Sequence, residues 1–208
     1  MPHIPVSPVL ENIAIFVTAM TAVIAVQGRR IDLFGVVVLA LVASFGGGTV
    51  RDMLLGRQAA WLTAPSYFAS AMAGALLTFF VARFRAVPDL ILQVADVFSM
   101  ALFTMIGTQK GLDAPAPLSV PVLVLLGVAT GVAGGILRDV AIGRVPMVFR
   151  SQIKLYATAA VAGSLVYIWA MRYPDIGQVW ASIIGITAVM ALRLAALRWE
   201  LSLPELKA

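Results

Sequence analysis

Two segments of the sequence place a small group of glycines three residues before an adjacent arginine and aspartate. The residues are Gly46, Gly47, Gly48, Arg51 and Asp52 in the first segment and Gly131, Gly134, Gly135, Arg138 and Asp139 in the second. Both segments are otherwise apolar, and an ionised side chain inside a bilayer costs roughly 2.5–3.5 kcal/mol unless it faces a polar interior. The two Arg-Asp pairs therefore predict either a wet pathway or buried ion pairs that brace the fold.

Adjacent residues of a helix do not share a face, so an arginine and the aspartate after it are not expected to pair with each other. We expect Arg51 to pair with Asp139 of the other segment. Arg138 is expected to pair correspondingly with Asp52.

Closely spaced glycines favour breaks in the two helices, because glycine is a poor helix former. Backbone groups freed by such breaks would have to face water or protein. The hydroxyls of Ser44, Thr49 and Thr130 lie beside the glycines and could bind an ion, although bonding back to their own helix is commoner. Asp96 is predicted either to line an entrance or to sit at the interface near a helix N-terminus.

The elements that carry these residues are membrane helices. Apolar residues make up 61% of the chain and charged residues 12%, against roughly 45–50% and about 25% in soluble domains. Each apolar run is long enough to span a bilayer. The runs cover 9–27, 33–56, 66–84, 90–108, 119–143, 152–171 and 178–198. We expect one all-α, polytopic membrane domain over 1–208 with seven transmembrane helices, of which the second and fifth are broken at glycines.

An internal repeat relates the two glycine segments. At a fixed offset of 87, residues 39–57 align with 126–144 without a gap, and seven of nineteen positions are identical. One repeat holds three helices, so the second copy must cross the membrane in the opposite sense. We expect repeat 1 over 9–85, repeat 2 over 90–172 and an extra helix over 177–200. Inverted repeats are typical of proteins that carry solutes or ions.

Basic residues indicate the orientation. With the N-terminus outside, ten arginines and lysines fall in cytoplasmic segments and three, namely Arg57, Lys110 and Arg172, fall outside. The positive-inside rule then predicts an external N-terminus and a cytoplasmic C-terminus in the cell (plasma or inner) membrane.

Several functions are excluded by composition. The chain has no cysteine, and its one histidine is His3. Thiol chemistry, a histidine-based metal site and a catalytic triad are therefore excluded, and we expect no cofactor and no bound metal. The net charge of +5 comes from residues at the ends of apolar runs, which favours membrane topology over nucleic-acid binding.

The two glycine segments resemble the signatures of the prokaryotic branch of the trimeric intracellular cation (TRIC) channel family. Asp96, the run 101–103 and the run 107–110 also resemble the fourth helix of that family. The resemblance covers about residues 9–195. The same prokaryotic domain is also known as a glycine-transporter-like domain.

The resemblance implies a homotrimer with one ion pathway in each subunit, lined by helices 2 and 5 together with 1 and 4. The permeant ions would be monovalent cations, K⁺ or Na⁺ and chiefly K⁺, and the partners would be other subunits and membrane lipid. The second glycine group departs from the pattern because it is not continuous. The Lys-Glu-Val signature of animal members is absent, so their lipid-binding residues are not carried over.

Three functions are weighed. The first is a K⁺-permeable cation channel, and the alternative is a secondary transporter of a small solute such as glycine, since inverted repeats suit both. The third is an intramembrane enzyme with Asp52 and Asp139 as an aspartyl dyad. An arginine beside each aspartate keeps both ionised, which disfavours the dyad and any enzymatic role.

Overall fold

The computed structural model describes residues 8–149, 155–173 and 175–199, and these ranges form seven α-helices and no strand. The helices are α1 (Pro8–Ala25), α2 (Leu33–Leu54), α3 (Pro65–Phe84), α4 (Asp89–Leu112), α5 (Val120–Ala141), α6 (Tyr156–Ala170) and α7 (Gly177–Arg198). Two short 3₁₀ helices, η1 (Ala60–Leu62) and η2 (Met147–Phe149), follow α2 and α5. The predicted all-α fold with seven helices is confirmed.

Six of the helices are long and apolar enough to cross a membrane, and α6, with 15 residues, is shorter. The expected start of the sixth helix, at residue 152, lies outside the described residues. The fourth helix continues to Leu112, four residues beyond its expected end. The chain is a multi-pass membrane protein.

Local sequence explains where the glycine-bearing helices begin and end. The carboxylate of Asp32 accepts a hydrogen bond from the Gly35 N–H at 2.8 Å and caps the start of α2. Gly56 and Gly143 have φ of +63° and +68°, a left-handed conformation in which glycine commonly terminates a helix. They follow α2 and α5 at equivalent positions, so both helices stop in the same way.

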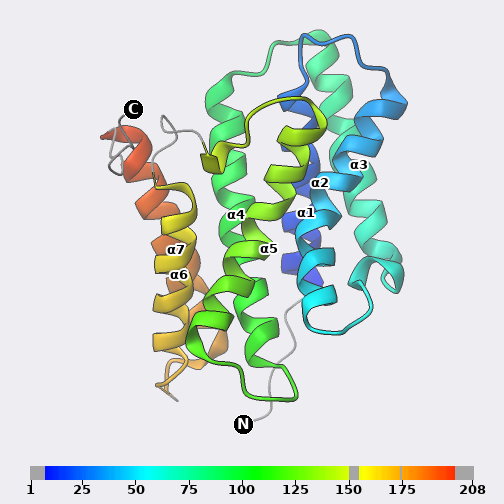
Figure 1. The fold of residues 1–208 in the computed structure, drawn as a ribbon. Helices are drawn as coiled ribbons and strands as arrows, with labels where there is room; N and C mark the ends of the chain where they lie inside the picture. Colours follow the sequence, from blue (N-terminus) through cyan, green and yellow to red (C-terminus); the bar gives the residue numbers. More distant parts are fainter. Residues whose placement is uncertain (1–7, 150–154, 174, 200–208) are drawn as a thin grey trace, which may run out of the picture.

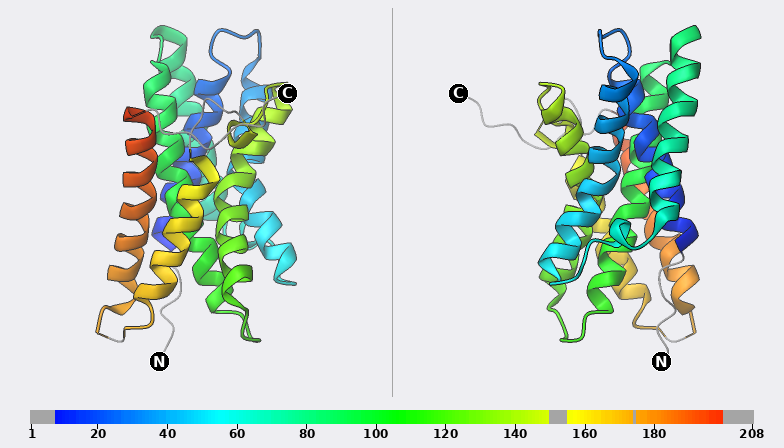
Figure 2. Two further views of the ribbon diagram at one scale, coloured as in Figure 1. Left: turned by 60° about the vertical axis from the view of Figure 1, so that its left-hand side comes forward. Right: turned by 90° about the vertical axis from the view of Figure 1, so that its right-hand side faces the viewer.

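The helices form one bundle in which α1, α2, α4 and α5 pack together (Figure 1). Helix α3 lies against α1 and α2, whereas α6 and α7 lie against α4 on the other side (Figure 2). The spanning parts of α1 and α4 are 56% and 67% buried, against 28–33% for the four other long helices. The four-helix centre therefore places α1 and α4 where polar groups are best shielded from lipid.

The second half of the bundle repeats the first upside down. Helix α1 begins at the end of the molecule where α4 finishes, and α2 and α5 likewise run in opposite directions (Figure 1). The 3₁₀ helices η1 and η2 are separated by the same 87 residues as the sequence repeat. Helix α7 has no counterpart in the first half.

The expected breaks in helices 2 and 5 are wrong. Helix α2 runs without interruption through Gly46–Gly48, and α5 runs through Gly131–Gly135. A glycine inside a helix costs about 1 kcal/mol, whereas each unsatisfied backbone group in hydrocarbon costs several. Continuity of the hydrogen bonds therefore outweighs the poor helix propensity.

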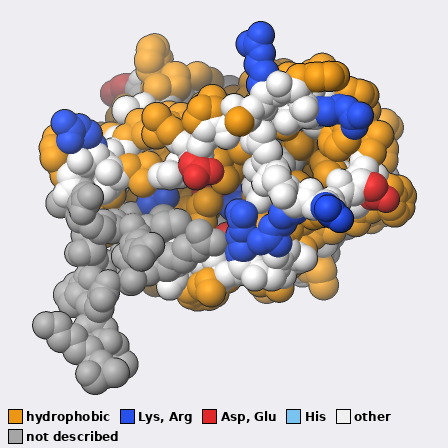
Figure 3. Space-filling model, turned by 90° about the horizontal axis from the view of Figure 1, so that it is seen from above, with side chains coloured by type: hydrophobic (Ala, Val, Ile, Leu, Met, Phe, Trp, Pro, Cys, Tyr) orange, Lys and Arg blue, Asp and Glu red, His pale blue; other side chains and the backbone are white. Residues whose placement is uncertain are grey.

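Basic side chains gather at the end of the bundle where α1, α3, α5 and α7 finish. Figure 3 views this end and shows several separate groups of basic side chains within a hydrophobic periphery. The described members are Arg29, Arg30, Arg83, Arg85, Arg144 and Arg198. The opposite end carries Arg57, Lys110 and Arg172.

Candidate functional site

The two glycine groups bring the backbones of α2 and α5 into direct contact. A Cβ atom on Gly47 would overlap the carbonyl oxygen of Thr130, and one on Gly134 would overlap that of Ala43. A Cβ on Gly46 would lie 3.9 Å from the Cα of Gly134. The glycines therefore permit close helix packing, as small residues do in membrane bundles.

The remaining glycines of the two groups lie beside other parts of the site. A Cβ on Gly131 would overlap the hydroxyl of Thr104 on α4. Gly48 and Gly135 lie beside the guanidinium groups of Arg51 and Arg138, 3.6 and 3.9 Å from the place of a Cβ. At these distances a Cβ would make ordinary van der Waals contact, so the position of the arginine does not require the glycine.

Charged side chains, of which all but that of Lys110 are buried, form two clusters in the bundle. The first cluster consists of Glu11, Arg51, Asp52, Tyr67 and Lys110, and the second of Thr21, Asp96, Arg138, Asp139 and Tyr156. The first lies toward the end where α1 begins, and the second toward the basic end. The glycine contact lies between them along the bundle.

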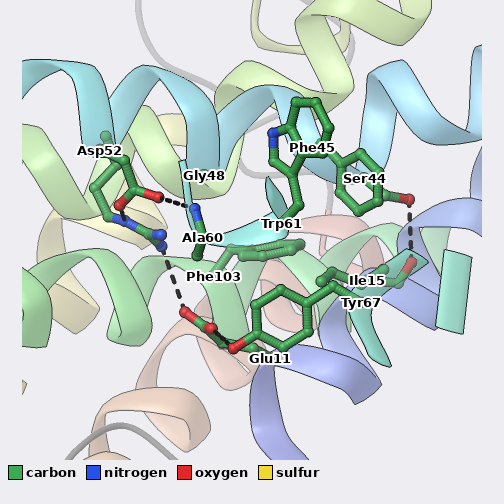
Figure 4. Close-up of a pocket in the computed structure, with 11 residues that line it drawn as sticks. Glu11, Ile15, Ser44, Phe45, Gly48, Asp52, Ala60, Trp61, Tyr67 and Phe103 are labelled. Carbon is green, nitrogen blue, oxygen red and sulfur yellow. Dashed lines mark hydrogen bonds and ion pairs between the residues drawn. The ribbon is translucent and has the colours of Figure 1, made fainter. Parts of the chain in front are cut away.

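The first cluster is centred on two carboxylates (Figure 4). Arg51 donates from Nε to Asp52 Oδ1 at 2.8 Å, and its Nη1 lies 3.7 Å from Glu11 Oε1. The hydroxyl of Tyr67 donates to Glu11, and Lys110 Nζ lies 2.5 Å from Glu11 Oε1. Two carboxylates thus face two cations, of which Arg51 is buried and Lys110 has a side chain that is 19% exposed.

In the second cluster both carboxylates contact the arginine directly. Arg138 donates from Nε to Asp139 at 2.9 Å, and from Nη1 to Asp96 at 2.9 Å and to Thr21 at 3.0 Å. The Tyr156 hydroxyl donates to the second oxygen of Asp96 at 2.8 Å. Every one of these side chains is buried. On the far side of Tyr156, α7 places the guanidinium of Arg193 4.7 Å from the ring centroid, a cation–π contact.

The expected cross-repeat ion pairs are wrong. Each arginine binds the aspartate that follows it, at 2.8 Å for Arg51 and 2.9 Å for Arg138. The long arginine side chain passes beside a glycine and turns back so that its Nε reaches the next residue. The rule that neighbouring helix residues do not share a face considers only the directions of the Cβ atoms and does not predict this contact. The acids from other helices are Glu11 for Arg51 and Asp96 for Arg138.

Each aspartate also fixes the turn after its helix. Asp52 Oδ2 accepts the Ala60 N–H and Asp139 Oδ2 accepts the Met147 N–H, both at 3.0 Å and both eight residues on. The two carboxylates have separate partners at opposite ends, so they do not share a proton as an aspartyl dyad must. Among the described residues, no group of three or more His, Cys, Asp and Glu could hold a metal ion.

The hydroxyls of Ser44, Thr49 and Thr130 all donate to backbone carbonyls. Thr49 and Thr130 donate to the carbonyls four residues back, on Phe45 and Leu126. Ser44 instead donates to the Ile15 carbonyl of α1 at 3.1 Å, so it ties α2 to α1. Ser44 and Thr130 also line the cavity beside the glycines.

Two small cavities border the clusters and the glycine contact. The first is lined by the first cluster and by the aromatic rings of Phe45, Trp61 and Phe103. The second lies between the glycines and Asp96 and has room for about one water molecule. Ser44 and Phe103 line both cavities, so these two residues lie between them.

Sequence reasoning missed six members of the site, namely Glu11, Thr21, Tyr67, Lys110, Tyr156 and Arg193. Glu11 and Asp96 play equivalent roles, yet their separation is two residues short of the repeat offset of 87. The tyrosines Tyr67 and Tyr156 are two residues beyond it. An ungapped comparison therefore does not align them, although an acid in the first turns of an apolar helix was a usable signal.

Fold and site together define a helical membrane protein built from two inverted halves, with clusters of charged side chains on either side of a glycine contact. The chain belongs to the TRIC family, also named UPF0126, whose profile, described as glycine transporter, matches residues 8–83 and 93–172.

Relatives and solved structures agree with this assignment. The UPF0126 inner membrane protein YadS of Escherichia coli K12 is 38% identical over 94% of this chain and 93% of its own length. A Vibrio cholerae UPF0126 membrane protein is also 38% identical, over 94% of this chain and 82% of its own. The crystal structure of the TRIC orthologue from Rhodobacter sphaeroides has a TM-score of 0.84 and 30% identity, covering 93% of this chain and 98% of that one. A structure that addresses conductance through TRIC cation channels has a TM-score of 0.81 and 28% identity, covering 98% of both chains.

Proposed function

We propose that this protein is a monovalent-cation channel, permeable to K⁺, with one pathway in each subunit of a homotrimer in the inner membrane. The observation that carries the proposal is the pair of charged clusters, each bordered by a cavity, with Ser44 and Phe103 lining both cavities. Buried ionisable residues in a membrane bundle mark ion pathways by default. The similarity to TRIC channels supports cations as the permeant species.

The pathway of this proposal runs between α1, α2, α4 and α5. From the end where α1 begins it passes the first cluster, then the glycine contact, then Asp96 and the second cluster. The central space admits about one water, so conduction requires α2 and α5 to separate slightly at the glycines. The N-terminus lies outside and the C-terminus in the cytoplasm, which the six-to-three distribution of described basic residues supports.

A secondary transporter of glycine is the second candidate, and the description of the matching profile favours it. A zwitterion requires a carboxylate and a guanidinium close together, and each cluster supplies both. Alternating access would open one cluster at a time to water.

Purified protein in planar bilayers and in liposomes separates the two candidates. A channel gives discrete current steps in KCl, and a carrier gives saturable exchange of labelled glycine without steps. We expect steps whose reversal potential follows the K⁺ gradient. Asp96→Asn should change the unitary current, whereas Asp89→Asn, an exposed acid at the start of the same helix, should not. Glycine exchange without current steps would overturn the channel proposal.

A further inference from the structure

The two clusters differ in how the acid contributed by the neighbouring helix is neutralised. In the second cluster Arg138 Nη1 contacts Asp96 directly at 2.9 Å. In the first cluster the corresponding distance, from Arg51 Nη1 to Glu11 Oε1, is 3.7 Å. The ammonium of Lys110, at 2.5 Å, is therefore the close positive charge at Glu11.

Lys110 is suited to leave this position. It lies in the last turn of α4, and its side chain is 19% exposed, whereas those of Arg51 and Glu11 are 2% and 5% exposed. A lysine ammonium is a compact, strongly hydrated charge on a flexible stem, so it can move into nearby water without breaking backbone contacts.

The surroundings of Glu11 suit a small cation. The carboxylate accepts the Tyr67 hydroxyl and lines the first cavity, where Phe45 and Trp61 stack with centroids 5.3 Å apart (Figure 4). Without Lys110, two acids, Glu11 and Asp52, would face the single charge of Arg51. A buried excess of one negative charge must be neutralised by an ion or by a proton.

We propose that Glu11 is a binding site for a small monovalent cation, and that the Lys110 ammonium occupies it as a tethered counter-ion that free cations replace. The site would lie at the mouth of the pathway where α1 begins. This inference deepens the proposed function, on which its relevance to conduction rests. Cation binding itself can be measured without any current.

The test is the thermal stability of the full-length protein with Lys110→Gln, in detergent at pH 8.0, in KCl or in N-methyl-D-glucamine chloride of equal ionic strength. A bound ion stabilises the folded state by mass action. We expect K⁺ to raise the midpoint of Lys110→Gln by about 3–6 °C, the shift for a roughly tenfold excess of ion over its dissociation constant in a chain of this size. Methylammonium should act like K⁺.

Three controls make the result specific. Wild type and Arg172→Gln, which removes an exposed charge at the same end, should show no difference between the two salts. The double variant Glu11→Gln/Lys110→Gln restores charge balance without either ionised group. It should fold, and its midpoint should be the same in the two salts. If Lys110→Gln folds in KCl but not in N-methyl-D-glucamine chloride, that dependence on K⁺ also supports the site.

Equal midpoints of Lys110→Gln in the two salts would overturn the proposal, because Glu11 would then be taking up a proton instead. A shift produced by free glycine but not by K⁺ or methylammonium would also overturn it. Bilayer recordings on the same variant report separately on conduction. A cation-dependent midpoint without current steps would retain the site and reject the channel.

Discussion

Gly47 of α2 lies so close to the carbonyl oxygen of Thr130 on α5 that even a methyl group has no room between them. Gly134 stands in the same relation to the carbonyl of Ala43, so the contact is made twice, once from each half. This reciprocal contact holds the two inverted halves together at the centre of the proposed pathway.

Gly47→Ala should therefore destabilise the protein. The added methyl group would force α2 and α5 apart, and overpacking of this kind costs roughly 1–3 kcal/mol. The matched control is Gly48→Ala, whose methyl group would lie at an ordinary 3.6 Å from Arg51 Nη2. That change should be neutral or slightly stabilising, because alanine is the better helix former. Unfolding midpoints of the two variants in detergent test the difference, and equal midpoints would contradict the close contact.

Asp96→Asn should cost far more stability than Asp89→Asn. The first change removes the charged acceptor of Arg138 Nη1 and of the Tyr156 hydroxyl in a buried site, and a hydrogen bond to a charged group contributes roughly 1.5–3 kcal/mol. Asp89 begins the same helix but is exposed. Chemical denaturation of both variants provides the comparison. Similar losses for the two would show that Asp96 is not the buried counter-ion described here.

The turns after α2 and α5 depend on glycines with positive φ. Gly143→Ala should destabilise by roughly 1–2 kcal/mol, the cost of the left-handed conformation for a residue with a Cβ, since a Cβ there meets nothing within 4 Å. Gly143→Asn should lose less, because asparagine tolerates this conformation. The unfolding midpoints of Gly143→Ala, Gly143→Asn and wild type test this expectation. A Gly143→Ala variant as stable as wild type would contradict the strain.

The absence of cysteine allows the orientation to be measured directly. Arg172→Cys should react with a membrane-impermeant maleimide added outside intact cells, and Arg85→Cys should react only after the cells are opened. Both positions are exposed at opposite ends of the bundle. The reverse pattern would place the N-terminus in the cytoplasm.

The sequence was sufficient for the helices and the repeat, because apolar length and an ungapped motif report them directly. It was insufficient for the partners of Arg51 and Arg138, since these depend on how far a bent arginine side chain reaches. It also suggested breaks at the glycines, because glycine has a low helix propensity. The helices are continuous because satisfying the backbone hydrogen bonds in lipid is the larger effect. Glu11 escaped notice because the two halves have diverged by two residues at that position.

The most direct test of a pathway through each subunit is modification of Ser44→Cys by a methanethiosulfonate ethylammonium reagent during bilayer recording. Ser44 is buried and lines both cavities, whereas Val42, two residues earlier on α2, is an exposed apolar side chain. We predict that the reagent reduces the unitary K⁺ current of Ser44→Cys and leaves that of Val42→Cys unchanged. Full current through Ser44→Cys after modification confirmed by mass spectrometry would contradict the proposed path.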